Sequence, residues 1–364
     1  MNKAYKFRIY PNSEQQTMFA KTFGCVRFIY NMMLGDKIAH YEATKERLKI
    51  TPAQYKAEFE WLKEVDSLAL ANTQLQLEAA YRNFFRDKSI GFPNFKSKHK
   101  GHNSYTTNLV NGNIVIADGY LKLPKVGKVR VKQHRQIPED YVLKSVTVTK
   151  SPSGKYHASM LYEYEADISP VQIANVIGLD FSMRELYVSS DGETPEYPRF
   201  YRQAQAKLAK EQRKLSRRKK GGKNREKQKL KVARLHEKTA NQRKDFLHKQ
   251  SRQIANAYDA VCIEDLNMTG MSQALNFGKS VADNGWGMFT GFLVYKLPEQ
   301  GKRLVKIDKW FPSSKLCHVC GYINDELKLG SRDWVCAGCG THHDRDTNAA
   351  INIRNEGTRL LSSA

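Results

Sequence analysis

Long apolar runs are absent from this chain, and cysteines outside one cluster are few. None of its stretches approaches the ~20 apolar residues that span a bilayer, and its first residues contain no apolar signal core. We therefore expect a soluble, non-secreted protein without a membrane partner. Four of the six cysteines are clustered, which indicates a metal site rather than disulfides. Cys25 and Cys262 lie in apolar sequence and should be buried.

Acidic residues are also scarce. Against 60 Lys+Arg the chain has 37 Asp+Glu, and its net charge of +23 indicates a polyanionic partner whose binding depends on salt. A basic protein of membrane surfaces is the alternative, which we disfavour because the basic stretches lack a broad apolar face. The 364 residues are enough for two or more domains.

The positive charge is concentrated in a predicted helical hairpin over residues 203–258, broken at Gly221-Gly222. Residues 201–250 contain 19 Lys/Arg against 4 Asp/Glu, a net of +15. Charge runs are commonly just solvated faces, but one so unbalanced would repel itself unless a phosphate backbone lay beside it. We predict nucleic-acid contacts by Arg217, Arg218, Lys219, Lys220, Lys223 and Arg225.

The N-terminal third combines helices with a sheet. A strand over 3–10 precedes a capping box with Ser13 as N-cap and Gln16 reaching back, and a helix should follow. Thr51-Pro52 starts a second helix, and a third should run from about Ser67 to Arg86. Residues 13–88 therefore form a helical module, which Gly91–Lys96 ends.

After the helical module, apolar residues recur at every second position, as they do in β-strands. Residues 103–165 read as a small β-barrel or curled sheet, with a turn at Ser151–Gly154. The strand at 3–10 should join this sheet, which makes the helical module an insertion. From Asn175 the pattern changes to buried strands over 176–180 and 260–264, with a returning strand over 186–189.

Two CxxC knuckles, separated by 15 residues, predict a zinc site. Each can present two thiolates to one tetrahedral ion, and four thiolates leave no open position, so this zinc should be structural. Gly321 and Gly340 follow the knuckles and allow tight turns. Three histidines could compete as ligands but should lie at the surface: His318, His342 and His343. The predicted ligands are Cys317, Cys320, Cys336 and Cys339.

Three carboxylates form the candidate catalytic site. Asp180 and Glu264 each end a buried strand, and Asp346 lies at a predicted helix start. Carboxylates in this order can hold two Mg²⁺ or Mn²⁺ ions ~3.5–4 Å apart for hydrolysis of a phosphodiester bond. Each alone is more often a turn or cap residue. Asp265 should face away, and Asp344 competes with Asp346, which we favour; whether Asp344 assists stays open.

Together these motifs resemble the TnpB family of transposon-encoded RNA-guided nucleases, relatives of type V CRISPR effectors. The resemblance covers essentially the whole chain. Its motifs are Tyr5–Asn12, Gly91–Lys96, Leu215–Gly221, Ile263–Asn267, Phe311–Cys317 and Asp344–Ala350. One departure is Phe181-Ser182 after the first acid, where many members have a glycine; we expect the acid to remain usable.

The resemblance implies an α+β multidomain fold with an RNase H-like (RuvC) α/β nuclease core. It implies a wedge domain, with a β-barrel and an inserted helical recognition module, and a zinc ribbon that binds target nucleic acid. The implied ranges are 1–12 (first wedge strand), 13–98 (recognition module), 99–170 (wedge barrel), 171–310 (nuclease core with the hairpin 203–258), 311–342 (zinc ribbon) and 343–364 (third catalytic motif).

The resemblance also implies an activity. A guide RNA from the transposon end would pair with double-stranded DNA beside a short transposon-adjacent motif, and the RuvC-like site would cut the DNA. Asp180, Glu264 and Asp346 match the family's catalytic triad, and Ser67 and Asn72 lie where the family faces the duplex. A monomeric ribonucleoprotein is implied, in the prokaryotic cytoplasm and associated with the nucleoid when bound to DNA.

The sequence argues against three other functions. An RNA-guided DNA-binding repressor would lose the carboxylates, all three of which are present. A single-strand transposase would need a His-hydrophobic-His pair, which the sequence lacks. A guide-independent junction nuclease on the same core would be typically much smaller and lack the N-terminal module.

Overall fold

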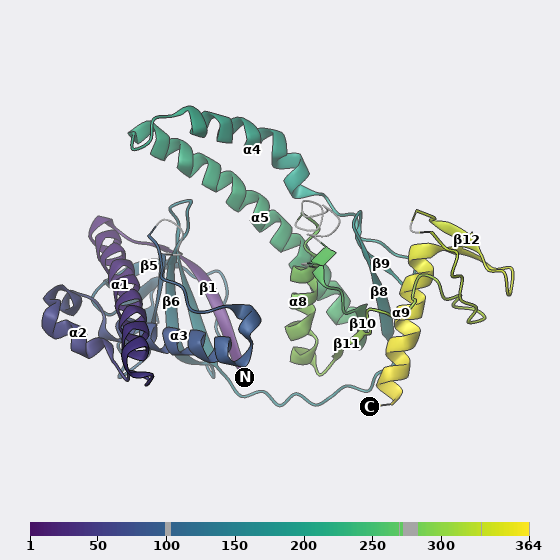
Figure 1. Ribbon diagram of the computed structural model, residues 1–364, viewed down its shortest axis with the longest axis horizontal. Helices are drawn as coiled ribbons and strands as arrows, with labels where there is room; N and C mark the ends of the chain where they lie inside the picture. The colour runs from purple at the N-terminus through teal and green to yellow at the C-terminus, as the bar shows by residue number, and fades with distance from the viewer. Residues whose placement is uncertain (99–102, 269, 272–282, 329, 364) are drawn as a thin grey trace. The chain divides into compact units, whose positions relative to one another are not determined.

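The computed structural model describes residues 1–98, 103–268, 270–271, 283–328 and 330–363, in two compact units (Figure 1). The first unit is Met1–Ala166 and the second is Asp167–Ala364. Within the described ranges, the chain has no helix that is both long enough and apolar enough to cross a membrane. The predicted boundary between residues 98 and 99 borders the undescribed residues 99–102.

The first unit contains a seven-stranded antiparallel sheet in the order β2-β6-β7-β1-β5-β4-β3. Its strands are β1 (Asn2–Tyr10), β2 (Asn103–Asn108), β3 (Val115–Ala117), β4 (Tyr120–Leu123), β5 (Gly127–Lys132), β6 (Val142–Lys150) and β7 (Tyr156–Glu163). Because β1 pairs with both β7 and β5, the N-terminal strand does join the sheet, and the helices between β1 and β2 are an insertion.

The sheet is open rather than a closed barrel. The order is linear, and the described strands show no pairing between its edges β2 and β3. Strand β3 has three residues, all paired with β4, so it offers little backbone for closing the sheet. The prediction of a closed barrel is therefore wrong, and the strands form an open sheet.

The inserted helices are α1 (Ser13–Thr44), α2 (Pro52–Glu58) and α3 (Ser67–Arg86), with short 3₁₀ turns at Glu60–Glu64 and Lys88–Ile90. The predicted N-cap of α1 is off by one residue. Asn12 Oδ1 accepts from Gln15 N at 2.8 Å, and Gln15 Oε1 accepts from Asn12 N at 3.1 Å. The Asn12–Gln15 pair has the same spacing as Ser13–Gln16, and the earlier box forms.

The inserted helices pack on the sheet through aromatic residues. Phe19 of α1 lies with its ring centroid 5.6 Å from that of Tyr156 and 6.2 Å from that of Tyr105. Asp66, the N-cap of α3, accepts from Leu68 N at 3.0 Å and also from the Thr107 hydroxyl of β2. The start of α3 is therefore tied directly to the sheet.

The second unit has a four-stranded sheet in the order β11-β10-β8-β9. Its strands are β8 (Val176–Ser182), β9 (Leu186–Ser189), β10 (Ala260–Glu264) and β11 (Arg303–Ile307). Strand β10 runs parallel to both β8 and β11, and β9 runs antiparallel to β8. The strands predicted over 176–180, 186–189 and 260–264 are confirmed, whereas β11 was not predicted.

Helices complete the second unit. These are α4 (Phe200–Arg217), α5 (Lys223–Ala257), α8 (Trp286–Lys296) and α9 (Arg345–Ser362), with a 3₁₀ turn at Pro298–Gln300. Figure 1 shows α4 and α5 as a long hairpin. The predicted break at Gly221-Gly222 lies in the loop between them. A two-stranded ribbon, β12 (Asp333–Val335) and β13 (His342–Asp344), precedes α9.

Two glycines let α9 lie directly against the sheet. A Cβ on Gly178 would overlap the Ala350 carbonyl oxygen and lie 2.6 Å from Arg354 N, and a Cβ on Gly357 would overlap Cys262 Sγ. Real Cβ atoms do not approach backbone so closely, so any side chain at Gly178 would push the helix away. This close approach sets the position of the first turn of α9, which carries Asp346.

Candidate functional site

Asp180 and Glu264 lie at the same edge of the second sheet. In the parallel pairing of β8 with β10, Leu179 lies opposite Ile263, so the two acids follow paired positions near the carboxyl ends of neighbouring strands. Glu264 ends β10 as predicted, whereas β8 continues to Ser182, so Asp180 does not end its strand. Asp346 lies in the first turn of α9, which packs against the same strands. The fold thus gathers three acids from segments far apart in the sequence.

The three carboxylates interact electrostatically. Burial, then the charges of Glu264 and Asp346, raise the pKa of Asp180 well above its ordinary range, and Arg345 opposes this. The carboxylate oxygens of the three acids are not all within 4.8 Å of one another. Among the described residues, only the four cysteines form a group with ligand atoms that close. Glu264 and Asp346 are each bonded to other side chains.

Glu264 is held by Ser313. Ser313 Oγ donates to Glu264 Oε1 at 2.5 Å, and this bond partly offsets the rise that burial causes in the pKa of Glu264. Asn352 Nδ2 donates to the carbonyls of Ser313 at 2.8 Å and Leu316 at 2.6 Å, and Asn348 Nδ2 donates to Leu316 at 2.8 Å. Both asparagines are buried in α9. They therefore clamp the turn that places the Ser313 hydroxyl on Glu264.

Asp346 and Asp344 have different partners. Asp344 is the N-cap of α9 and accepts from Thr347 N at 2.7 Å, whereas Asp346 Oδ2 pairs with Arg332 Nη1 at 2.5 Å. Engagement of Asp344 as a cap favours Asp346 as the third acid of the site. Arg332 was not predicted, although it lies between the two CxxC knuckles. Its carbonyl also accepts from Arg345 N at 2.7 Å.

Asp265 lies outside this constellation, as expected from strand alternation. Its carboxylate pairs with Lys306 Nζ at 2.8 Å, and its side chain is exposed. Its side chain and that of Glu264 have different partners, although the two residues are adjacent in the sequence.

The four knuckle cysteines converge in a second cluster. Cys317 Sγ lies 3.7 Å from Cys339 Sγ, and Cys320 Sγ lies 3.5 Å from Cys336 Sγ. Four sulfurs at ~2.3 Å from one tetrahedral zinc would lie about 3.8 Å apart, so the set fits zinc and is too widely spaced for disulfides. The Thr341 hydroxyl helps to lower the pKa of Cys339 to about 6, whereas contact with Cys339 raises the pKa of Cys320, so the thiolate form is favoured at Cys339 alone of these two.

One prediction about the histidines was wrong. His343 is 2% exposed, its Nε2 lies 3.1 Å from Cys317 Sγ, and its ring packs against Trp334. His343 therefore supports the thiol cluster from outside instead of lying at the surface. His318 is partly buried, with Nδ1 2.9 Å from Asn348 Oδ1, and His342 is exposed.

The six predicted hairpin contacts divide into two groups. Arg218 Nη1 donates to the Asn224 carbonyl at 2.7 Å, and Arg225 Nη1 donates to the carbonyls of Leu215 and Arg218. These two guanidinium groups therefore brace the tip. The other four are exposed: Arg217, Lys219, Lys220 and Lys223.

A buried acid connects the two helices of the hairpin. Glu211 of α4 accepts from Gln228 Nε2 of α5 at 2.7 Å and pairs with Lys231 Nζ at 3.2 Å. The bond from Gln228 is the largest cause that lowers the pKa of Glu211 to about 2. Because this pKa is depressed, the stabilisation is present above the ordinary value of 4.5 and is lost as pH falls towards about 2.

We expect Glu211→Gln to loosen the hairpin, because it removes a charge that Gln228, Lys231 and, at 3.5 Å, Lys214 satisfy. Hydrogen exchange at pH 7 should become severalfold faster in α4 and α5. Glu226→Gln is the matched control, since Glu226 is exposed and meets Lys229 only at 3.9 Å. Equal exchange in the two variants would contradict a bracing role for Glu211.

The predicted contacts at the start of α3 are in part engaged within the protein. Ser67 Oγ accepts from Lys56 Nζ at 2.8 Å, and Asn72 Nδ2 donates to the Leu68 carbonyl at 2.9 Å. Ser67 is nevertheless exposed at the first turn of the helix. The amide oxygen of Asn72 is not used by that bond and can still accept.

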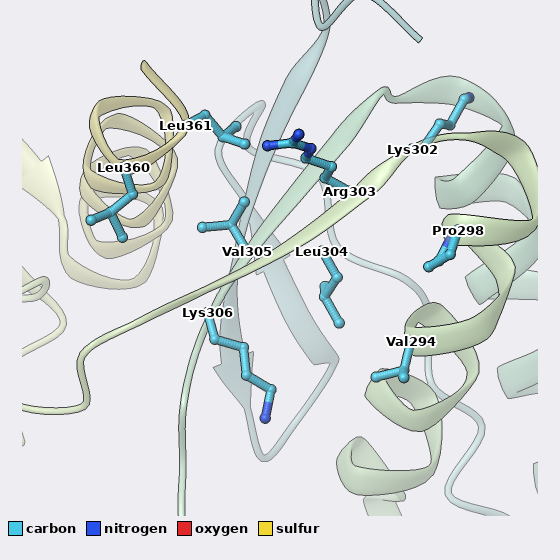
Figure 2. Close-up of a pocket in the computed structure, with 9 residues that line it drawn as sticks. All are labelled: Val294, Pro298, Lys302, Arg303, Leu304, Val305, Lys306, Leu360 and Leu361. Atoms are coloured by element: carbon cyan, nitrogen blue, oxygen red, sulfur yellow. The ribbon is translucent and has the colours of Figure 1, made fainter. Parts of the chain in front are cut away.

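A separate hollow of about 610 Å³ follows the edge strand β11, between α8 and the end of α9 (Figure 2). Its lining includes Val294, Leu304 and Leu360, with Arg303 and Lys306 as basic members. The lining contains no carboxylate or thiol, so this hollow differs in chemistry from both clusters described above.

Three family models match the chain. One described as "Probable transposase" (OrfB_IS605) covers residues 159–275, one described as "Cas12f1-like, TNB domain" covers 286–353, and one described as "Helix-turn-helix domain" covers 1–46. In that last range the structure has the strand β1 and the single helix α1.

Curated relatives match over nearly the whole chain. A "Putative RNA-guided DNA endonuclease" of Streptomyces pristinaespiralis is 35% identical, over 97% of this chain and 89% of the relative. One of Escherichia coli K12 with the same description is 30% identical, over 99% and 93%. A "TnpB-like protein" of Acanthamoeba polyphaga mimivirus is 30% identical over 35% of this chain and 25% of its own length.

This chain belongs to the TnpB family of RNA-guided DNA endonucleases. The resemblance drawn from its motifs is therefore confirmed. A solved Cas12f1–sgRNA–target DNA complex has the same mixed α/β fold: its TM-score is 0.62 at 13% identity, over 98% of this chain and 99% of that one. In this TnpB family member, the cysteine cluster lies within the range matched by the Cas12f1-like domain.

Proposed function

We propose that this protein is an RNA-guided DNA endonuclease whose RuvC-like core uses Asp180, Glu264 and Asp346. The single observation that carries the assignment of the site is the gathering of these acids beside one sheet edge, where burial, followed by the charges of Glu264 and Asp346, raises the pKa of Asp180. Such mutual repulsion is a common feature of carboxylates that share cations. Family membership, through relatives named as RNA-guided DNA endonucleases, supports the activity.

The donor set fits Mg²⁺ or Mn²⁺, which prefer oxygen ligands. When bound, two such cations would supply Lewis-acid stabilisation of the displacement at phosphorus. The chain's own residues prepare the site: Ser313 orients Glu264, and Arg332 balances the charge of Asp346. Zn²⁺ at Cys317, Cys320, Cys336 and Cys339 would have a structural role, because four thiolates leave no open coordination position.

The division of labour follows the family. We assign the guide RNA and the duplex beside the target to the first unit, with the wedge sheet and the recognition helices 13–98, and assign cutting to the second. Ser67 and Asn72 would face the transposon-adjacent motif, and the basic hairpin would follow phosphates. The guide RNA would come from the transposon end, in a monomeric ribonucleoprotein in the prokaryotic cytoplasm that associates with the nucleoid on binding DNA.

The test begins with the protein expressed together with its native flanking DNA. We expect one defined RNA to co-purify, and the complex to cut matching double-stranded DNA when Mg²⁺ is added. Cutting of branched junctions without RNA would instead support the guide-independent nuclease. Target binding by the wild-type complex without any cutting would support the repressor.

The exposed residues at the hairpin tip should determine part of the salt dependence. Replacing Arg217, Lys219, Lys220 and Lys223 with Gln should flatten the slope of log K against log salt for RNA binding by up to about 3 units, since each phosphate contact contributes roughly 0.7–0.9. The control exchanges Arg and Lys at these four positions and keeps the charge. An unchanged slope in the Gln variant would mean that the tip faces bulk water.

A further inference from the structure

The loop from Asp308 to Ser313 begins and ends beside Glu264. At its start, Ile307 lies opposite Glu264 in the β10–β11 pairing, and Asp265 N donates to the Ile307 carbonyl at 3.2 Å. At its end, Ser313 Oγ donates to Glu264. Three residues span at most ~11 Å. The Cα of Trp310, three residues from each anchor, is therefore within about 11 Å of both.

Trp310 projects from this loop into solvent. Its side chain is 81% exposed, the largest fraction for any large apolar residue in the described part of the chain. The backbone beneath it is held: Trp310 N donates to Asp308 Oδ1 at 2.7 Å, and Phe311 N donates to the Asp308 carbonyl at 3.1 Å. Exposure is thus not the result of a frayed segment, and the indole is presented from a braced turn.

One cation lies beside the indole. Lys309 Nζ lies 5.1 Å from the centre of the Trp310 ring, within cation–π distance, whereas Lys306 at the end of β11 is paired with Asp265. An exposed aromatic ring with an adjacent ammonium group is suited to a nucleotide, because the ring can stack on the base while the cation lies near the phosphate.

We infer that Trp310 is a stacking platform for an unpaired base of the DNA strand that enters the carboxylate site. The inference rests on the proposed function, which makes a phosphodiester the group cut beside Glu264. The base must be unpaired, because the faces of bases inside a duplex are covered by their neighbours. Stacking accepts every base, so Trp310 would position the strand without reading its sequence.

The test compares Trp310→Leu with Trp310→Phe in the purified ribonucleoprotein. Leu keeps apolar bulk but has no ring, whereas Phe keeps the ring. We expect Leu to raise KM for a matching DNA target about tenfold with a smaller change in kcat, and Phe to stay close to wild type. Tyr295→Ala is the control, because it removes a half-exposed ring from α8 in the same unit. Zinc content and Tm show that each variant is folded.

A binding measurement separates this inference from the proposed function. A single-stranded oligothymidine with one 2-aminopurine should be quenched on binding to the wild type and the Phe variant, and much less with Leu. Equal KM and equal quenching in Leu and wild type would overturn the stacking role, even if cleavage is normal. Absence of cleavage in the wild type, with quenching that still depends on Trp310, would overturn the proposed function alone.

Discussion

Replacing Asp180 with Asn should abolish DNA cleavage, lowering the rate about a thousandfold or more, while RNA and target binding persist. Asp180 lies two residues before the end of β8, where the charges of Glu264 and Asp346 act on it, and loss of its charge removes one of three oxygen donors for divalent cations. Binding should persist because the basic hairpin and the first unit are untouched. Cleavage of matching plasmid and mobility-shift titrations measure the two outputs separately.

Asp265→Asn is the matched control for this experiment. It makes the same chemical change one residue beyond Glu264, at a carboxylate that pairs with Lys306 on the surface. We expect nearly normal cleavage from it. A wild-type rate in Asp180→Asn, or an equal loss in Asp265→Asn, would contradict the assignment of the site.

Although Asp180→Asn should abolish cleavage, it should increase the stability of the folded protein. Because the pKa of Asp180 is raised, its ionised form is disfavoured in the folded protein, and stability falls as pH rises from 3.8 through the raised value. At pH 7 without divalent cations, Asp180→Asn should therefore raise the Tm. Mn²⁺ should stabilise the wild type more than the variant, as measured by thermal shift. A lower Tm in the variant would mean that Asp180 has a structural role.

Replacing Cys317 or Cys336 with Ser should release the zinc, unfold the ribbon and eliminate cleavage. These sulfurs are 1% exposed, and the small apolar core of the ribbon consists of them with Trp334 and the partly buried Leu327. So small a core cannot stabilise the segment without metal, which contributes about 10–16 kcal/mol in comparable zinc peptides. The structure thus predicts one zinc per wild-type chain and much less in the variants.

Unfolding of the ribbon should also disturb the positions of the carboxylates, because residues in and next to the ribbon contact them. Arg332, which pairs with Asp346, lies between the knuckles, and the Ser313–Leu316 turn leads into Cys317. Zinc content (by elemental analysis), Tm and the cleavage rate should all decrease on treatment with a chelator and recover when Zn²⁺ is added. Cys25→Ala is the control, since Cys25 is buried in α1 outside the cluster. Unchanged zinc content in Cys317→Ser would contradict the predicted ligand set.

Elements with a strong local signal were predictable from the sequence. The buried runs over 176–180 and 260–264 became β8 and β10, and the helix predicted from Ser67 to Arg86 became α3. Strand β11 and helix α8 were missed. Arg303–Ile307 is a short run that becomes a strand because β10 pairs with it, and Trp286–Lys296 is apolar without a clear one-sided stripe.

By itself, the sequence determined the chemistry available to this protein: four thiols at ligand spacing, three acids near the ends of predicted elements and a hairpin rich in Lys and Arg. Those features depend on residue type and local spacing. Only the tertiary structure decided which groups meet. It buried His343 against Cys317, paired Arg332 with Asp346 and Ser313 with Glu264, and left Trp310 exposed. The contacts of Asp346, which α9 carries, and of Ser313, which α9 holds, depend on how closely Gly178 and Gly357 let the helix approach the sheet, which local sequence does not encode.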